Sequence, residues 1–472
     1  MWYAKCRKES NENIILKKQY TMSEEKMNRR GFLKASTVLG VGSVVGASAL
    51  LSACKDRNAL VPLKQPGEFY VPELPDKAMD GKELKVGVIG CGGRGSGAVK
   101  NLLEAANGIK VHALGDVFAD RVEGLREDLK NNHQQEVPTE NCFIGFDAYK
   151  QVIDSGVDMV ILTTPPVFRP IHFQYATQKN KHSFLEKPIA VDAKGYRTIM
   201  ATAKQAQAKN LSVITGTQRH HQRPYVEANK QIQAGLIGEI TGGNVYWNQS
   251  MLWYRNREKG WSDMEWMIRD WVNWKWLSGD HIVEQHVHNI DVFLWMSGYR
   301  VAKATGFGSR QRRITGDQYD NFSVDFEMEN GVHLHSMCRQ LDGCSNLVGE
   351  FIQGTRGSWN SVNHEIKDLK GNVIWKYDEE AAKAAFKQHN PYVLEHVDWV
   401  NHIRKGTAHD EATECAISSL VGVMGRESAY KGSTVTWDEM SQSDLDYMPE
   451  KLELGAMDMS KHQVEVPGKE QK

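Results

Sequence analysis

The pattern that most restricts the fold is a strand that runs directly into a glycine-rich loop. An apolar strand pattern over 84–89 leads into Gly-Cys-Gly-Gly-Arg-Gly at 90–95. A helix pattern follows over 96–107, and a second strand pattern over 110–114 leads to Asp116. Two strands joined by a helix indicate a parallel βαβ unit. Glycines at its first turn let a pyrophosphate approach the helix N-terminus, where free N–H groups favour an anion. The pattern therefore predicts a Rossmann domain that binds a dinucleotide.

The same stretch indicates which dinucleotide is bound. Asp116 closes the second strand, where a carboxylate can accept hydrogen bonds from the adenosine ribose and repel a 2′-phosphate. No arginine stands at 117 or 118, so we expect NAD rather than NADP. A glycine-rich turn without a nucleotide is the alternative. The predicted cofactor contacts of the loop are Gly90, Gly92, Gly93, Arg94 and Gly95.

Strand and helix patterns continue to alternate along the first half of the chain. Further strand patterns cover 157–162, 183–185 and 211–215. This alternation predicts a parallel sheet, and ligands of such sheets bind at the carboxyl ends of the strands. We therefore expect the residues that follow two of these strands to line the cofactor crevice. They are Thr164, Pro165, Glu186 and Lys187.

The segment Glu-Gln-His-Val-His-Asn-Ile-Asp at 284–291 gathers ionisable groups. Its apolar residues have helical spacing, and on one helix Glu284, His288 and Asp291 share a face. His286 then points roughly 200° away from His288, which disfavours a two-histidine chelate, so no metal site is predicted. A histidine beside a carboxylate can transfer a proton near neutral pH. A proton relay is favoured here, and a metal site and a polar helix surface are the alternatives.

The second half of the chain predicts an α+β domain with a mostly antiparallel open sheet. Alternating patterns over 322–328, 332–337 and 347–353 are separated by turn residues. Helix patterns over 391–405 and 412–430 follow. The predicted fold class is thus α/β, with an N-terminal Rossmann domain and a C-terminal α+β domain.

The predicted domain organisation has five parts. They are a signal region 1–54, an extended linker 55–81, the Rossmann domain 82–217, the α+β substrate and oligomerisation domain 218–445, and a C-terminal tail 446–472.

Tryptophan is concentrated before the polar segment. Seven of the thirteen tryptophans fall between residues 247 and 276. Aromatic faces with polar edges suit sugar rings, while core or oligomer packing is the equal alternative. For Asp291, orienting the helix or His288 is favoured over contacting substrate. The predicted substrate-binding set is Arg219, His220, Trp274 and Asp291.

The N-terminal region predicts export. Asn-Arg-Arg-Gly-Phe-Leu-Lys at 28–34 is a twin-arginine pattern, and the weakly apolar run over 35–51 suits a signal peptide better than a membrane anchor. Leu-Ser-Ala-Cys at 51–54 is similar to a lipobox, with Cys54 as the lipidated residue. We expect an exported lipoprotein of a Gram-negative bacterium, periplasmic or associated with the outer membrane, that meets the membrane only through Cys54. A short N-terminal helix is the alternative.

Charge and cysteine spacing exclude other classes of function. The formal net charge is -1 at pH 7, which provides no basic field for nucleic acid. The seven cysteines form no paired CxxC sets, so neither a structural zinc nor a disulfide framework is indicated.

Several of these motifs together resemble the Gfo/Idh/MocA oxidoreductase family. The glycine loop, Thr-Thr-Pro-Pro at 163–166, Glu-Lys-Pro at 186–188 and the segment 284–291 carry the resemblance, which extends over residues 82–440. It implies that Lys187 lies beside the nicotinamide and the substrate hydroxyl, and that His288 is the catalytic base. Glu284 stands where the family has an aspartate. The resemblance also implies a homo-oligomer, either a dimer or a tetramer.

The predicted function is an NAD-dependent sugar or glycoside dehydrogenase. Lys187, His288 and Glu284 would act on a secondary hydroxyl, with C3 as a candidate position. No free NAD is expected outside the cytoplasm, so the nicotinamide must be tightly held and recycled in place. One alternative is a redox-neutral NAD-dependent glycoside hydrolase of the same superfamily, although the tyrosine of its pattern is absent from 218–221. The others are an epimerase or isomerase and a non-catalytic cofactor- or sugar-binding protein.

Overall fold

The computed structural model describes residue 63 and residues 69–468. The predicted signal region 1–54, with Cys54, lies outside the described residues. Residues 55–62 and 64–68 of the predicted linker also lie outside them. Among the helices that are described, none combines the length and the apolar character needed to cross a membrane.

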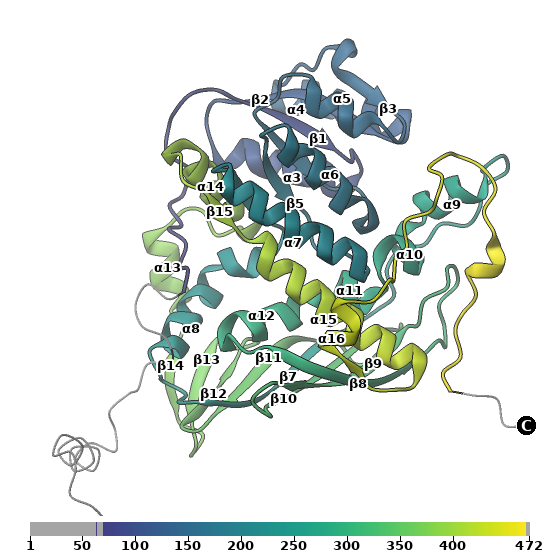
Figure 1. Cartoon of the computed structure of the whole chain (residues 1–472). Coiled ribbons are helices and arrows are strands. Elements are labelled where there is room, and N and C mark those ends of the chain that lie inside the picture. The colour runs from purple at the N-terminus through teal and green to yellow at the C-terminus, as the bar shows by residue number, and fades with distance from the viewer. Residues whose placement is uncertain (1–62, 64–68, 469–472) are drawn as a thin grey trace, which may run out of the picture. The chain divides into compact units, whose positions relative to one another are not determined.

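The first domain is a seven-stranded sheet (Figure 1) whose strand order is β15-β6-β5-β4-β1-β2-β3, with every pair parallel. Its strands are β1 (Leu84–Ile89), β2 (Ile109–Asp116), β3 (Cys142–Ile144), β4 (Met159–Leu162), β5 (His182–Leu185), β6 (Ser212–Thr215) and β15 (His409–Asp410). Its helices are α3 (Gly93–Ala105), α4 (Ala119–His133), α5 (Ala148–Asp154), α6 (Arg169–Gln178), α7 (Ala193–Ala208) and α14 (Pro391–Lys405).

Apolar runs explain why the central strands lie where they do. All four residues of β4 are buried, as expected for a strand covered on both faces of a parallel sheet. Val88 of β1 pairs with Leu114 of β2 on one side and Ile161 of β4 on the other. Because parallel strands point the same way, their carboxyl ends meet at one edge, and the glycine loop begins there. The predicted Rossmann fold is confirmed.

Part of this domain comes from much later in the chain than its predicted boundary at 217. Val393, Val397 and Trp399 of α14 lie in the same hydrophobic cluster as Val86 and Val88 of β1. The short strand β15 extends the sheet beyond β6. The predicted domain 218–445 therefore contains a segment that packs on the first domain, because the apolar face of α14 is buried there.

The second domain is built on a nine-stranded sheet with the order β14-β13-β12-β11-β7-β10-β9-β8-β16. Only β7 and β10 pair in parallel, and the other neighbours are antiparallel. The strands are β7 (Ile240–Gln249), β8 (Val301–Ser309), β9 (Asn321–Met328), β10 (His333–Gln340), β11 (Leu347–Gly354), β12 (Gly357–Asn360), β13 (Glu365–Asp368), β14 (Val373–Lys376) and β16 (Val435–Thr436). The predicted mostly antiparallel sheet is confirmed.

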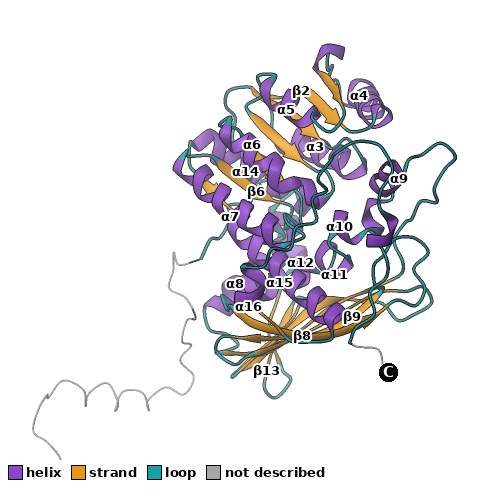
Figure 2. Cartoon of the chain, turned by 45° about the vertical axis from the view of Figure 1, so that its right-hand side comes forward, coloured by secondary structure: helices purple, strands orange, loops and turns teal. Residues whose placement is uncertain are grey.

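Helices cover the face of this sheet that is turned toward the first domain (Figures 1 and 2). They include α12 and α15, whose apolar residues share one cluster with the strands. The helices of this part of the chain are α8 (Arg223–Gln233), α9 (Asp263–Arg269), α10 (Lys275–Ser278), α11 (His281–Glu284), α12 (Val287–Ser297), α13 (Glu379–Ala385), α15 (Ala412–Lys431) and α16 (Trp437–Ser441).

The single helix predicted for the segment 284–291 is wrong in one respect. The chain forms two helices, α11 and α12, with a break at Gln285. The N–H groups of Gln285 and His286 both donate to the carbonyl of His281, at 3.0 Å each. This widened turn inserts an extra residue into the helical path, so Glu284 and His288 belong to different helices.

Alanine substitutions at two glycines test how closely the cofactor loop packs. A Cβ atom at Gly95 would lie 1.8 Å from the Gly90 carbonyl oxygen, whereas a Cβ at Gly124, on the surface of α4, would meet nothing within 4 Å. We expect Gly95→Ala to lower the free energy of unfolding by about 1–3 kcal/mol. Gly124→Ala should raise it by about 0.5–1 kcal/mol. Urea denaturation measures both, and equal effects would contradict the packing described here.

Candidate active site

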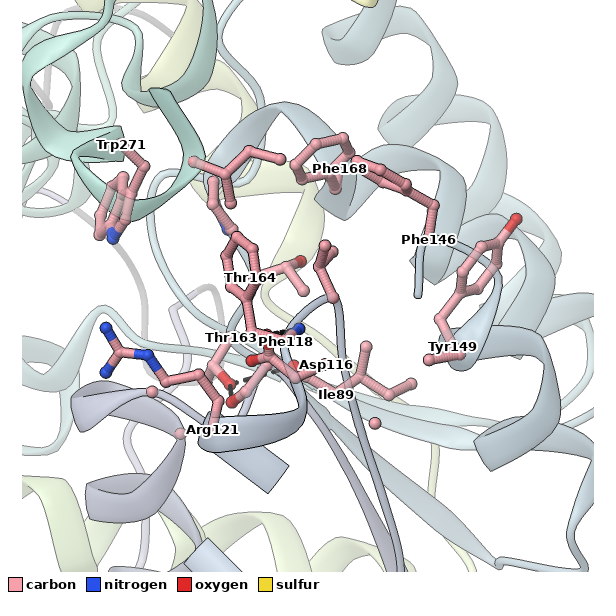
Figure 3. A pocket seen from close by; sticks show the side chains of 18 of the residues that line it. Ile89, Asp116, Phe118, Arg121, Phe146, Tyr149, Thr163, Thr164, Phe168 and Trp271 are labelled. Carbon is pink, nitrogen blue, oxygen red and sulfur yellow. Dashed lines mark hydrogen bonds between the residues drawn. The ribbon is translucent and has the colours of Figure 1, made fainter. Parts of the chain in front are cut away.

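A cavity of about 420 Å³ opens at the carboxyl ends of β1, β2 and β4. Every predicted loop contact lies on its wall, together with Asp116, Thr164 and Pro165. Figure 3 shows Asp116 and Arg121 on one side, with Trp271 and Phe168 opposite. Cβ atoms at Gly92 and Gly93 would meet nothing within 4 Å, so the N-terminus of α3 is open to an anion. The cavity therefore suits the pyrophosphate and adenosine of a dinucleotide.

The Asp116 carboxylate is held in place by two backbone groups. Cys91 N–H donates to its Oδ2 at 2.7 Å, and Phe118 N–H donates to its Oδ1 at 3.0 Å. Burial raises the pKa of Asp116 above its usual value. The side chain thus presents a fixed acceptor at the end of β2, where the ribose was predicted to bind.

Arg94 and Glu186 contact each other, and this was not predicted. The Arg94 Nε pairs with a Glu186 oxygen, and its Nη2 lies 3.2 Å from Glu395 Oε1. The guanidinium is therefore engaged by two carboxylates beneath the loop. Sequence reasoning missed Glu395, which comes from α14, because no local pattern connects it with the glycine loop about three hundred residues earlier.

The break between α11 and α12 creates a site for Lys187. In a continuous helix the Glu284 carbonyl would accept from His288 N–H. Here His288 N–H donates to Gln285 O at 3.3 Å. Lys187 Nζ instead donates to the Glu284 carbonyl at 2.6 Å and to its Oε1 at 3.1 Å. The structure thus brings together two of the predicted catalytic residues, with a geometry that the sequence did not indicate.

His288 lies beside this pair and is 5% exposed. Its ring stacks on Trp247 at 5.7 Å. Burial, followed by the positive charges of Lys187 and Arg219, holds the pKa of His288 well below its usual value. Its ring nitrogens make no hydrogen bond within residues 69–468. An unprotonated histidine with free nitrogens can accept a proton at neutral pH.

Arg219 is fixed from behind by a buried carboxylate. Its Nη1 lies 2.5 Å from Glu350 Oε1, on β11. Asn289 Nδ2 donates to the same oxygen at 2.7 Å, and Tyr225 OH donates to Oε2 at 2.9 Å. Sequence reasoning missed Glu350, which stands at an inward-facing position of an ordinary alternating strand.

His220 and Asp291 form a pair of their own. His220 Nε2 lies 2.6 Å from Asp291 Oδ2, and Ser418 OH donates to Oδ1 at 2.8 Å. Although burial opposes it, the Asp291 carboxylate raises the pKa of His220 to about 9. Asp291 therefore positions His220. The sequence instead favoured a role for Asp291 in orienting the helix or His288. The predicted substrate contact of either residue stays a prediction.

The tryptophan-rich segment covers the cofactor cavity. Trp274, predicted to bind substrate, is 3% exposed and packs in a hydrophobic cluster against Trp266, so we do not carry it forward as a substrate contact. Trp253 and Trp271 line the cavity instead. The sequence distinguishes Trp253 and Trp271 only as members of the group of seven tryptophans between residues 247 and 276.

A second segment joins this cover. Met264 N–H donates to Gly455 O at 3.1 Å, and Met457 N–H donates to Asp263 Oδ2 at 3.0 Å. Leu452 lines the cavity, so the predicted tail is packed against the body. We call residues 253–271 and 447–457 together the clasp.

Arg269 fastens the clasp to the first domain. Its Nη1 and Nη2 each lie 3.1 Å from an oxygen of Asp120, and its guanidinium lies 3.9 Å from the Phe118 ring centre. These contacts lie next to Asp116, at the adenosine end of the cavity. Of the described residues that line this cavity, none is Lys187, Glu284 or His288.

Comparison with known proteins gives the same two domains. The model of the oxidoreductase family with an NAD-binding Rossmann fold matches residues 84–215, and that of the GFO/IDH/MocA C-terminal domain matches residues 225–360.

Similar curated proteins include a dehydrogenase and a glycosyl hydrolase. The scyllo-inositol 2-dehydrogenase (NAD(+)) of Bacillus subtilis is 22% identical over 75% of this chain and 97% of that protein. A glycosyl hydrolase family 109 protein of Shewanella pealeana is 28% identical over 48% of this chain. The chain spans 47% of the length of that relative.

Solved structures share the fold. The scyllo-inositol dehydrogenase of Lactobacillus casei with bound NAD(H) and scyllo-inositol has a TM-score of 0.57 at 18% identity, covering 75% of this chain and 99% of its own. A levoglucosan dehydrogenase in complex with NADH and L-sorbose has a TM-score of 0.59 at 17% identity, with the same coverage. Because two models of one family match successive segments that together span more than half of the chain, the chain belongs to the Gfo/Idh/MocA family of NAD-binding oxidoreductases.

Proposed function

We propose that this protein is an NAD-dependent dehydrogenase acting on a secondary hydroxyl of a sugar or glycoside. The observation that carries the proposal is the contact of Lys187 Nζ with Glu284 beside the buried His288. A protein that only binds a cofactor needs no unprotonated base next to a fixed ammonium.

The roles of the side chains follow from their charges. NAD supplies the hydride acceptor when it is bound. His288 accepts the hydroxyl proton, because burial keeps its ring unprotonated. Lys187 stabilises the negative charge that develops on the substrate oxygen. Glu284 holds the ammonium in position through its carbonyl and its carboxylate.

Support for a polyhydroxylated substrate comes from the stacking partner of His288 and from the relatives. Trp247 offers an aromatic surface at the site, which suits the C–H face of a sugar ring. The relatives named for scyllo-inositol and levoglucosan act on ring alcohols. C3 stays the candidate position for oxidation.

The clasp supports the further proposal that the nicotinamide cofactor is tightly held. Arg269, Trp253 and Trp271 line the cavity from outside the Rossmann domain, and Arg269 contacts Asp120 and Phe118 next to Asp116. A cofactor enclosed in this way can be reduced and reoxidised without leaving. That property suits an exported enzyme.

Export, lipidation and self-association are proposed from the sequence. The twin-arginine pattern at 28–34 and the lipobox-like Cys54 support a lipoprotein outside the cytoplasm. Comparing membrane fractions of cells that carry the native chain and Cys54→Ser tests the anchor. A homo-oligomer is proposed from the family resemblance, and light scattering tests it.

A redox-neutral glycoside hydrolase is the second candidate. The match to a glycosyl hydrolase family 109 protein favours it. The dehydrogenase ranks first because its relative is matched over 97% of its length.

A single-turnover experiment separates the two candidates. We expect the full chain with NAD⁺ and a panel of sugars and glycosides to form stoichiometric reduced nicotinamide and a product two hydrogens lighter, followed by absorbance and mass spectrometry. Aglycone release without net cofactor reduction would move the assignment to the hydrolase.

In the same assay His288→Gln should lower the rate by about 100-fold or more. His335→Gln, on β10, should not change it.

The pH dependence follows from the environment of His288. Because its pKa is held well below 6.5, hydride transfer should stay at its full rate at pH 6.5 and decline only at lower pH. Lys187→Met removes a positive charge that contributes to this lowering, so the pKa of His288 should rise and the acid limb should move to higher pH. Lys303→Met, in a surface ion pair, should leave the limb in place. An unshifted limb in Lys187→Met would contradict the assignment of His288.

The clasp has its own test. We expect Arg269→Ala to release bound NAD about tenfold faster, because the variant loses a cation–π contact and an ion pair at the adenosine end. Lys259→Ala, an exposed cation of the same segment, should have no effect. Loss of cofactor during rapid gel filtration measures both rates. Equal rates would show that the clasp does not retain NAD.

A further inference from the structure

A second polar cluster lies away from the proposed reaction centre. Asp398 and His402 lie on α14, His409 begins β15, and Glu411 directly precedes α15. His221, from the 3-10 helix η3 (Gln218–His221), lies behind them. The cluster takes no part in the proposed hydride transfer. Asp398, His402, His409 and Glu411 fall within residues 398–411, and His221 joins them from a distant segment.

The donor atoms face one another at distances close to those of a coordination sphere. His402 Nε2 lies 3.8 Å from Asp398 Oδ1, and His409 Nε2 lies 3.6 Å from Glu411 Oε1. The donor atoms of Asp398, His402 and His409 all lie within 4.8 Å of one another, and those of His221, Asp398 and Glu411 form a second group of the same size that shares Asp398. Tetrahedral ligands about 2.0–2.2 Å from zinc are about 3.3–3.6 Å apart. A contraction of up to about 1.5 Å therefore brings the donors of Asp398, His402 and His409 to a common ion.

Neighbouring groups orient these donors as they do around metal ions. His402 Nδ1 lies 2.9 Å from Thr407 Oγ1, which leaves Nε2 turned into the cluster. Thr215 N–H donates to Glu411 Oε2 at 2.9 Å, which leaves Oε1 facing the histidines. Such second contacts fix the tautomer and orientation of metal ligands.

The fully buried His221 contacts the carboxylates of Asp398 and Glu411 on the buried side of the cluster. Its Nε2 lies 3.2 Å from Asp398 Oδ2 and 3.5 Å from Glu411 Oε1. Both carboxylates are therefore directed into the cluster.

Tyr70 and His409 show that the polar groups of this cluster are incompletely paired. The hydroxyl of Tyr70 lies 2.8 and 2.7 Å from the two Asp398 oxygens and 2.9 Å from His402 Nε2. Its one proton can be donated to a single partner at a time. His409 Nε2 is buried and has no hydrogen-bond partner in the part of the chain that the structure describes. A cation at this position would satisfy all of these groups.

We propose that Asp398, His402, His409 and Glu411 bind one divalent transition-metal ion of the zinc type. Two imidazoles and two carboxylates favour such an ion over calcium or magnesium, which prefer oxygen alone. Tyr70, whose side chain is at the surface, then turns its hydroxyl and its proton to solvent. The ion joins α14, β15 and α15 at the edge of the Rossmann sheet.

The site also lies beside the segment that leads into the first domain. Met79 N–H donates to Asn401 Oδ1 at 2.8 Å, one residue before His402. Lys405, one turn further along α14, lies 3.2 Å from Glu73. A bound ion should therefore stabilise the folded chain as a whole, by mass action on the native state.

Cobalt provides the first test, because it needs no substitution. The full chain is treated with a chelator, exchanged into metal-free buffer and titrated with Co²⁺. We expect visible d–d absorption that saturates at one equivalent and disappears on adding Zn²⁺, and one zinc per chain by elemental analysis after desalting. Absence of a saturable cobalt spectrum would overturn the proposal.

Variants distinguish this site from surface binding. His402→Ala and His409→Ala should each weaken zinc binding at least about tenfold, and zinc should no longer raise their melting temperatures. His333→Ala removes an exposed histidine that is 2.8 Å from Asp325 and should behave as the native chain does. Bound NAD and circular dichroism report folding. Equal zinc affinity in all three variants would show adventitious binding only and would refute the site.

Discussion

The contact between Lys187 and Glu284 governs the arrangement of the proposed reaction centre. It joins the end of β5, in the first domain, to the end of α11, in the second. It exists because the widened turn at Gln285 frees the Glu284 carbonyl from the helix. A buried ammonium without such partners is strongly unfavourable. The position of Lys187 relative to His288 therefore depends on a local irregularity of the helix, and a regular helix would remove one of its two acceptors.

Two other buried charged groups of this region have carboxylate partners of their own. Arg219 is paired with Glu350, and His220 with Asp291. Removing one member of a buried pair typically costs about 3–5 kcal/mol, because the other charge is left uncompensated. These pairs therefore hold their residues firmly in place. His288 differs, since its neighbours within the described chain are cationic and aromatic. His288 therefore differs from these paired groups in having no carboxylate partner among the described residues.

Local patterns predicted the parts of the structure that local interactions form. The strand, glycine loop and helix up to Asp116 were predicted because backbone geometry and burial within some thirty residues determine them. The shared helical face of Glu284 and His288 was wrong, because a hydrogen-bond shift of one residue cannot be seen in apolar spacing. Glu350 and Glu395 were missed because the arginines that pair with them lie more than a hundred residues away. Long-range pairing of this kind leaves no periodic signal.

The clasp changes what the tryptophan-rich block contributes. The sequence associates these rings with a sugar, yet Trp253 and Trp271 face the cofactor cavity, while Trp247 stacks on His288. The proposed cofactor retention therefore rests on segments 253–271 and 447–457, and the proposed proton transfer rests on β5, α11 and α12. No clasp residue is among the partners of Lys187 or His288 in the described chain. The two functions can then vary independently, so a change of substrate need not loosen the cofactor.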